Sequence, residues 1–180
     1  MSAANADSQP EAVPEQLVRT PELVALWRYW RSKLDGRPVL PRADFFPGDI
    51  PELLRVMTLT ERTPEGRLRY RIAGGTVVEA YGFEATGKYL DEILSPDRLQ
   101  VAHHHIGTAL ARARPVFSRT GYASAGGVRY VNSRLNIPLS DSAGAITLVV
   151  AAHVIEFGPA FRAQFGDRAL APSTDEFEVL

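Results

Sequence analysis

The stretch that decides the fold is residues 115–157, PVFSRTGYASAGGVRYVNSRLNIPLSDSAGAITLVVAAHVIEF. It contains two short turn sequences, AGG at 125–127 and DSAG at 141–144. The turns separate three extended runs, at 115–124, 128–139 and 145–157. Turns this short join neighbouring antiparallel strands, so the stretch predicts a three-stranded antiparallel meander.

The second and third runs differ in their hydrophobic pattern. Apolar and polar residues alternate through 130–139, which is typical of a half-buried strand. The run at 145–157 is apolar on both faces, which indicates a central strand covered on both sides. The sequence therefore predicts a sheet with layers on both faces.

Upstream, residues 55–62 and 68–73 read as a β-hairpin around the turn sequence at 63–66. Short helices are expected between 74 and 94. Ser95-Pro96-Asp97-Arg98 is a helix start, with a capping serine and proline at the first position, and it predicts a long helix to about Arg114.

The N-terminal part predicts one amphipathic helix. Thr20-Pro21-Glu22 is a start signal, and the apolar residues that follow recur at three- and four-residue steps. This stripe either caps the sheet or forms a dimer seam, and it consists of Leu23, Leu26, Trp27, Trp30 and Leu34.

Composition narrows the class of protein. The 180 residues are 45% hydrophobic with a net charge of −1, which indicates one folded core and argues against a dedicated nucleic-acid binder. Without cysteine, disulfides, thiolate metal sites and flavin–cysteine photochemistry are excluded. We expect a cytoplasmic protein, since the sequence shows neither a signal peptide nor an apolar run long enough to span a membrane.

The expected fold class is α+β, a five-stranded antiparallel sheet with short helices and one long helix on one face, plus the N-terminal amphipathic helix. The expected division of the chain is a disordered tail at 1–15, the amphipathic helix at 16–36, the main domain at 37–158 and a C-terminal extension with an acidic tail at 159–180.

This order of elements is that of the Per-Arnt-Sim (PAS) fold, and local sequences strengthen the resemblance. LPRADF at 40–45, DIP at 49–51, RYRIAG at 69–74 and YGFEATGK at 81–88 resemble stand-alone PAS-like proteins of alphaproteobacteria. The resemblance implies a sensory module without catalysis of its own. It acts through an unidentified signalling protein, and it sometimes holds a small ligand between sheet and helices.

Haem-binding PAS sensors place a histidine on the long helix, and this chain has three there, at 103–105. Neighbouring helical residues diverge by about 100°, so the three cannot ligate one metal ion. His103 shares the expected inner face with Ile106 and Leu110, which makes it the haem ligand if haem is bound. The alternative is a partly buried structural histidine, with the other two solvated.

Polar residues of the meander form a second candidate site. Arg119, Asn132 and Arg134 lie on strands joined by one hairpin, and arginine binds carboxylate or phosphate in a bidentate manner. An exposed polar sheet face is the alternative. The candidate ligand-binding residues are Tyr70, Tyr89, His103, Ile106, Leu110, Arg119, Asn132 and Arg134.

No catalytic set and no metal site emerge from the sequence, and no particular cofactor is indicated. The main hypothesis is a PAS-like regulatory module that forms a homodimer. The alternatives are a haem-based redox or gas sensor and a small non-PAS α+β enzyme or carrier.

Overall fold

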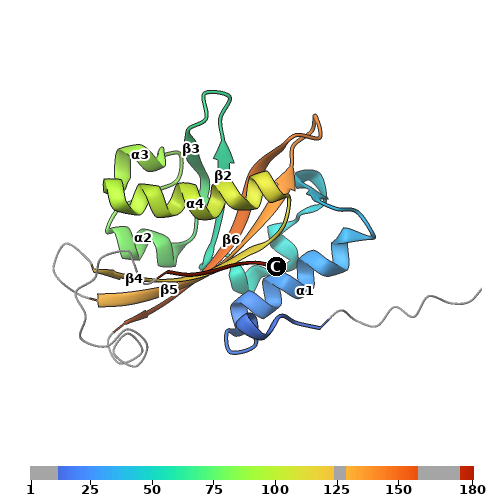
Figure 1. The fold of residues 1–180 in the computed structure, drawn as a ribbon, viewed down its shortest axis with the longest axis horizontal. Helices are drawn as coiled ribbons and strands as arrows, with labels where there is room; N and C mark the ends of the chain where they lie inside the picture. Colours follow the sequence, from blue (N-terminus) through green and yellow to red (C-terminus); the bar gives the residue numbers. More distant parts are fainter. Residues whose placement is uncertain (1–11, 124–128, 158–174) are drawn as a thin grey trace, which may run out of the picture.

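The computed structural model describes residues 12–123, 129–157 and 175–180. Seven strands form one sheet in the order β3-β2-β6-β5-β4-β7, and β1 runs parallel to the end of β5 (Figure 1). The strands are β1 (Leu40–Pro41), β2 (Met57–Arg62), β3 (Leu68–Ala73), β4 (Val116–Ala123), β5 (Arg129–Ser140), β6 (Ile146–Phe157) and β7 (Asp175–Val179). The helices are α1 (Pro21–Leu34), α2 (Gly75–Tyr81), α3 (Leu90–Ile93) and α4 (Pro96–Arg112), with short 3-10 turns between Glu15 and Leu53.

The predicted antiparallel pairings are present. β2 pairs with β3, and β4, β5 and β6 pair in succession, so the hairpin and the meander are confirmed. At the second turn the Asp141 amide donates to the Ala145 carbonyl, and Gly144 has a φ of +82° that favours glycine. The predicted turn at 125–127 lies outside the described residues.

The prediction of five strands is wrong, because the sheet has seven. β7 comes from the segment expected to be an acidic tail and pairs antiparallel with β4. In β7, Phe177 and Val179 alternate with Glu176 and Glu178, the pattern of a strand with one face on a core. It also covers the outer edge of β4, which would otherwise expose unpaired amides and carbonyls.

The two faces of the sheet carry different layers. Helices α2, α3 and α4 lie on one side and α1 lies on the other (Figure 1). Leu135, Ile137 and Val150 belong to the cluster under α1. Their neighbours along β5 and β6 point to α4, because successive residues of a strand face opposite sides.

Helix α1 packs against its own sheet. The stripe is at most 8% exposed and forms one cluster with β5 and β6. Leu17, just ahead of α1, is fully buried in the same cluster, and Val13 packs against that cluster. The boundary at residue 16 stays a prediction. A dimer through this stripe would have to expose it first.

Helix α4 is rotated relative to the sequence prediction. We expected His103 on the inner face, but His103 is exposed and His105 is 0% exposed. The buried positions are Ala102, His105, Ile106, Ala109 and Leu110, a stripe with steps of three and four residues. Ala102 and Ala109 in the stripe let the helix backbone lie close to the sheet. A helix turned so that His103 faced the sheet would place a larger side chain at this contact.

A search of the described helices finds none that is both long and apolar enough to cross a membrane.

Candidate functional site

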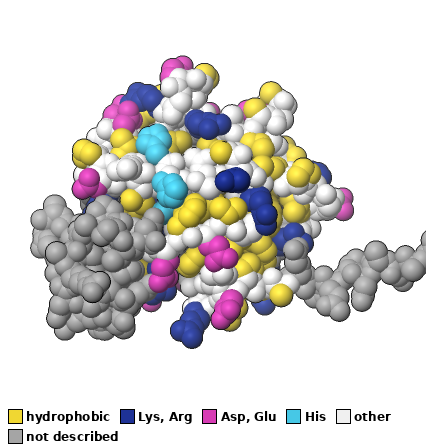
Figure 2. Space-filling model, in the orientation of Figure 1, with side chains coloured by type: hydrophobic (Ala, Val, Ile, Leu, Met, Phe, Trp, Pro, Cys, Tyr) yellow, Lys and Arg dark blue, Asp and Glu magenta, His cyan; other side chains and the backbone are white. Residues whose placement is uncertain are grey.

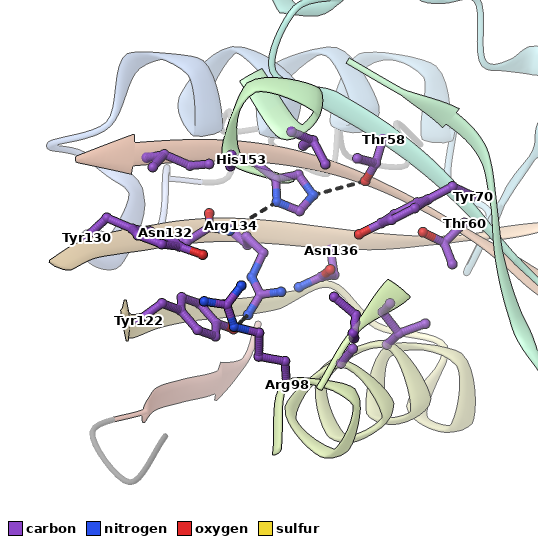
Figure 3. A pocket seen from close by; sticks show the side chains of 16 residues that line it. Thr58, Thr60, Tyr70, Arg98, Tyr122, Tyr130, Asn132, Arg134, Asn136 and His153 are labelled. Carbon is purple, nitrogen blue, oxygen red and sulfur yellow. Dashed lines mark hydrogen bonds between the residues drawn. The ribbon is translucent and has the colours of Figure 1, made fainter. Parts of the chain in front are cut away.

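A pocket lies between the α4 face of the sheet and helices α2 and α4 (Figure 3). Its volume is about 40 Å³, room for about three water molecules. The sheet contributes a polar floor of Thr58, Thr60, Asn132, Arg134, Asn136 and His153, and three tyrosines, Tyr70, Tyr122 and Tyr130. The remaining walls are Val77, Ala80, Leu94, Arg98, Ala102, Ile106 and Ile155.

The strand register assembles this floor. Asn136 lies between Val116 on β4 and Ala151 on β6, and Ala151 lies opposite Thr58 on β2. Partners across an antiparallel ladder point to the same face, so the polar residues of β2, β5 and β6 converge. Polar residues at every second position of β5 therefore become one surface under α4.

His153 is a buried polar group of the floor and bonds to residues of two neighbouring strands. Its Nε2 lies 3.0 Å from the Thr58 hydroxyl and its Nδ1 lies 3.3 Å from the Asn132 amide nitrogen. Because the amide nitrogen donates, Nδ1 accepts and the proton sits on Nε2, facing Thr58. Burial, together with the nearby Arg134 charge, lowers the pKa of His153 to about 3, so the ring is neutral at physiological pH.

Asn132 is only partly satisfied by this arrangement. The residue is 8% exposed, and its Oδ1 has no hydrogen-bond partner among the described residues. A buried acceptor without a donor costs about 1–3 kcal/mol. The pocket thus contains a position that favours an N–H or O–H donor.

Arg134 and Arg98 bring positive charge to the pocket around Tyr122. Arg134 Nη2 donates to the Tyr122 hydroxyl at 2.9 Å and lies 3.2 Å from His105 Nδ1. The Arg98 guanidinium lies 5.1 Å from the ring centre of Tyr122, and Tyr122 stacks on Tyr130 with centroids 5.4 Å apart. These residues, next to Asn132, combine aromatic faces with cationic donors, a setting that suits a flat group bearing acceptor atoms.

The structure brings four of the eight candidate residues together. Tyr70, Ile106, Asn132 and Arg134 line the pocket. Tyr89, His103, Leu110 and Arg119 do not line it.

Three of those four lie elsewhere for a visible reason, and His103 lies exposed on α4. Tyr89 lies at the start of α3 under the Arg67 guanidinium, whose carbon is 3.7 Å from the centre of the tyrosine ring. Leu110 is buried in the core beyond the pocket. Arg119 lies opposite Ser133 in the ladder, which puts it on the α1 face, where it pairs with Glu156 at 3.1 Å. The expected meeting of Arg119 with Asn132 and Arg134 is therefore wrong.

The residues present do not fit haem. His103 is exposed and lies outside the pocket, and Figure 2 shows histidine side chains at the surface over the helical layer. The pocket's own histidine, His153, is hydrogen-bonded at both ring nitrogens. No group of three or more potential metal ligands occurs within residues 12–123, 129–157 and 175–180.

Sequence analysis missed Arg98, Tyr122 and His153. Arg98 was noticed only as part of a helix start, and His153 lies within an otherwise apolar run. Tyr122 could have been found from the turn at 125–127, because that turn pairs Tyr122 with Tyr130.

The fold and the pocket define an α+β sensor-type domain, with a buried polar cavity between a sheet and a long helix. A comparison with known protein families matches residues 18–152 to the family described as PAS domain. The chain belongs to the PAS domain family. This membership confirms the resemblance and overturns the non-PAS alternative.

Similar solved structures were found as well. VqmA bound to DPO shows 14% identity and a TM-score of 0.47, covering 61% of this chain and 57% of VqmA. An RNA-binding light-oxygen-voltage (LOV) receptor shows 16% identity and a TM-score of 0.42, covering 64% of this chain and 34% of the receptor. A Rhodobacter sphaeroides LOV protein shows 15% identity and a TM-score of 0.43, covering 62% of this chain and 68% of the LOV protein. The chain thus matches little more than half of VqmA. No curated protein matches.

Proposed function

We propose that this PAS domain binds a small, flat, hydrogen-bonding molecule between the sheet and α4 and passes the signal to a partner protein. The observation that carries the proposal is the unpartnered Oδ1 of Asn132, buried in the pocket. A ligand with an N–H or O–H group would satisfy it. The PAS family supports the sensory role.

The residues around Tyr122 support a polar ligand too. Arg98 and Arg134 offer donors, and Tyr122 with Tyr130 offers an aromatic surface. A molecule with both a donor and acceptor atoms would pair with Asn132 and with the two arginines. The volume of about 40 Å³ admits a few waters, so a ligand would displace them and move Arg98, which is only partly buried.

Homodimerisation and a signalling partner complete the proposal. The α1 stripe is buried in its own chain, so contact surfaces are expected elsewhere. The prediction that the chain binds no nucleic acid stays a prediction.

Native mass spectrometry of freshly purified protein tests the proposal, with the denatured mass as reference. We expect a reproducible non-covalent increment that is lost in Asn132→Leu, which keeps the side-chain volume and removes the acceptor. Tyr89→Phe, altered outside the pocket, is the control and should keep the increment. The same spectrum reports monomer or dimer.

No increment in protein purified from its host, or after incubation with a small-molecule extract of that host, would contradict ligand binding. An increment that survives Asn132→Leu would place the ligand elsewhere.

A further inference from the structure

A line of side chains connects the pocket to the last strand. Arg134, on the pocket floor, lies 3.2 Å from Nδ1 of His105 on α4. The His105 ring stacks on Phe177 of β7, with centroids 5.3 Å apart and an angle of 17° between the rings. Pocket and edge strand therefore share one contact path through a fully buried histidine.

Each step of this path has a defined chemistry. Arginine has only donors, so Nδ1 of His105 accepts and the neutral ring carries its proton on Nε2. The hydrogen bond fixes the ring plane, and the ring plane in turn sets the stack with Phe177. His104 also touches Phe177, at 4.5 Å between ring centres, so α4 grips this side chain from two positions.

The rest of β7 is held by its backbone and by side-chain contacts near the surface, among them a hydrogen bond from Gln16 Nε2 to the Glu178 carboxylate. It pairs with β4 over the five residues Asp175 to Val179, and the Leu180 amide donates to the Pro115 carbonyl at 2.8 Å. Glu176 and Glu178 are exposed, and Phe177 and Val179 are only partly buried. A short edge strand with so little buried apolar surface opens more easily than the central strands.

We propose that docking of β7 on β4 is coupled to the pocket through Arg134, His105 and Phe177, so that β7 reports the state of the pocket. The proposal rests on the proposed function in one respect, that the ligand supplies acceptor atoms to Arg134. An acceptor that draws Arg134 from His105 removes this hydrogen bond from the imidazole, weakens the stack on Phe177 and loosens β7. The uncovered β4 edge then offers backbone donors and acceptors to a partner strand.

Hydrogen exchange of the full chain, followed by mass spectrometry without any added ligand, tests the coupling. Arg134→Met keeps much of the side-chain volume and removes the hydrogen bonds of Arg134 Nη2 to His105, Tyr122 and Thr120. We expect amides at 176–180 to exchange about tenfold faster, the effect of losing the hydrogen bond to His105, with the β2–β6 ladder unchanged.

Asn132→Ala is the matched control. It lies on the same strand and face, two residues away, but contacts His153 instead of His105. Its exchange at 176–180 should stay at the wild-type rate. Unchanged exchange in Arg134→Met, or equal acceleration in Asn132→Ala, would overturn the proposal.

A second variant, altered at β7 instead of at the pocket, tests the same coupling and does not require Arg134→Met to fold. Coupling is reciprocal, so Phe177→Ala should shift the NMR signals of the Arg134 guanidinium and the His105 ring. The indole N–H signals of Trp27 and Trp30, on the far face of the sheet, should stay in place. Unshifted Arg134 and His105 signals would overturn the coupling.

The two proposals fail separately. A native mass without an increment would contradict ligand binding, and the coupling could still be measured without ligand. Unchanged exchange in Arg134→Met would remove the coupling and leave the ligand in place.

Discussion

The two faces of the central sheet are made by the same strands and have opposite chemistry. Under α1, Leu135 and Ile137 of β5 are fully buried among aliphatic and indole side chains. Under α4, Asn132, Arg134 and Asn136 of the same strand are at most 8% exposed and meet further polar groups from β2 and β6. Both faces are thus buried, but the α1 face is apolar around Leu135 and Ile137, whereas the α4 face is polar along the same strand.

We relate the apolar face under α1 to the stability of the fold and the polar face under α4 to the proposed ligand binding. Burying aliphatic side chains stabilises the fold in proportion to the apolar area removed from water. Burying polar groups costs free energy unless each finds a partner, and Asn132 Oδ1 has none among the described residues. The proposed ligand, with its N–H or O–H group, would offset the cost of burying this acceptor.

The largest expected effect comes from neighbouring residues on opposite faces. Ile137→Ala removes a fully buried side chain under α1 and should lower the free energy of unfolding by about 2–5 kcal/mol. Asn136→Ala, one residue away, removes one 3.4 Å bond to the Val116 carbonyl and should cost about 1 kcal/mol. Urea denaturation measures both. Equal losses would remove the distinction between the faces.

The pH dependence should come next in size. Folded His153 has a pKa of about 3, against about 6.5 in the unfolded chain, so the unfolded state takes up the proton first as the pH falls. Stability contributed by the neutral ring is complete above pH 6.5 and is lost as the pH falls toward 3. Between about pH 5.5 and 4 we expect the slope to approach about 1.4 kcal/mol per pH unit.

His153→Gln carries no titrating ring and should reduce that slope, as measured by thermal or urea unfolding at several pH values. His103→Gln, altered on the exposed side of α4, is the control and should keep the wild-type slope. If stability depended on pH in the same way in His153→Gln and in wild type, His153 would take up its proton at the same pH in the folded and unfolded states, and the lowered pKa would be contradicted.

The parts of the fold that sequence predicted are those fixed by local pattern. The turn at 141–144 and the helix start at 95–98 are each encoded within a few residues, and the structure has elements there. β7 was missed because its pairing with β4 is long-range, and its five residues stand in an acidic context. Tertiary pairing, more than local preference, decides such a segment.

The errors at the site have two different physical origins. His103 was chosen over His105 because it was placed on one face with Ile106 and Leu110. Those two are buried, but their stripe includes His105 and two alanines and leaves His103 outside. Arg119 was misplaced although the signal was in the sequence. A turn centred on 126 puts Arg119 opposite Ser133, and antiparallel partners share a face, so Arg119 could not meet Arg134.

The smallest expected effect compares those two arginines. Arg119 makes a partly exposed ion pair with Glu156 on the α1 face, so Arg119→Gln should change the free energy of unfolding by less than about 1 kcal/mol. It should also leave any ligand increment in the native mass unchanged, whereas Arg134→Met should reduce that increment, because only Arg134 lines the pocket. If Arg119→Gln removed the ligand increment and Arg134→Met kept it, the ligand would bind at the α1 face, and the assignment of binding to the α4 face would be wrong.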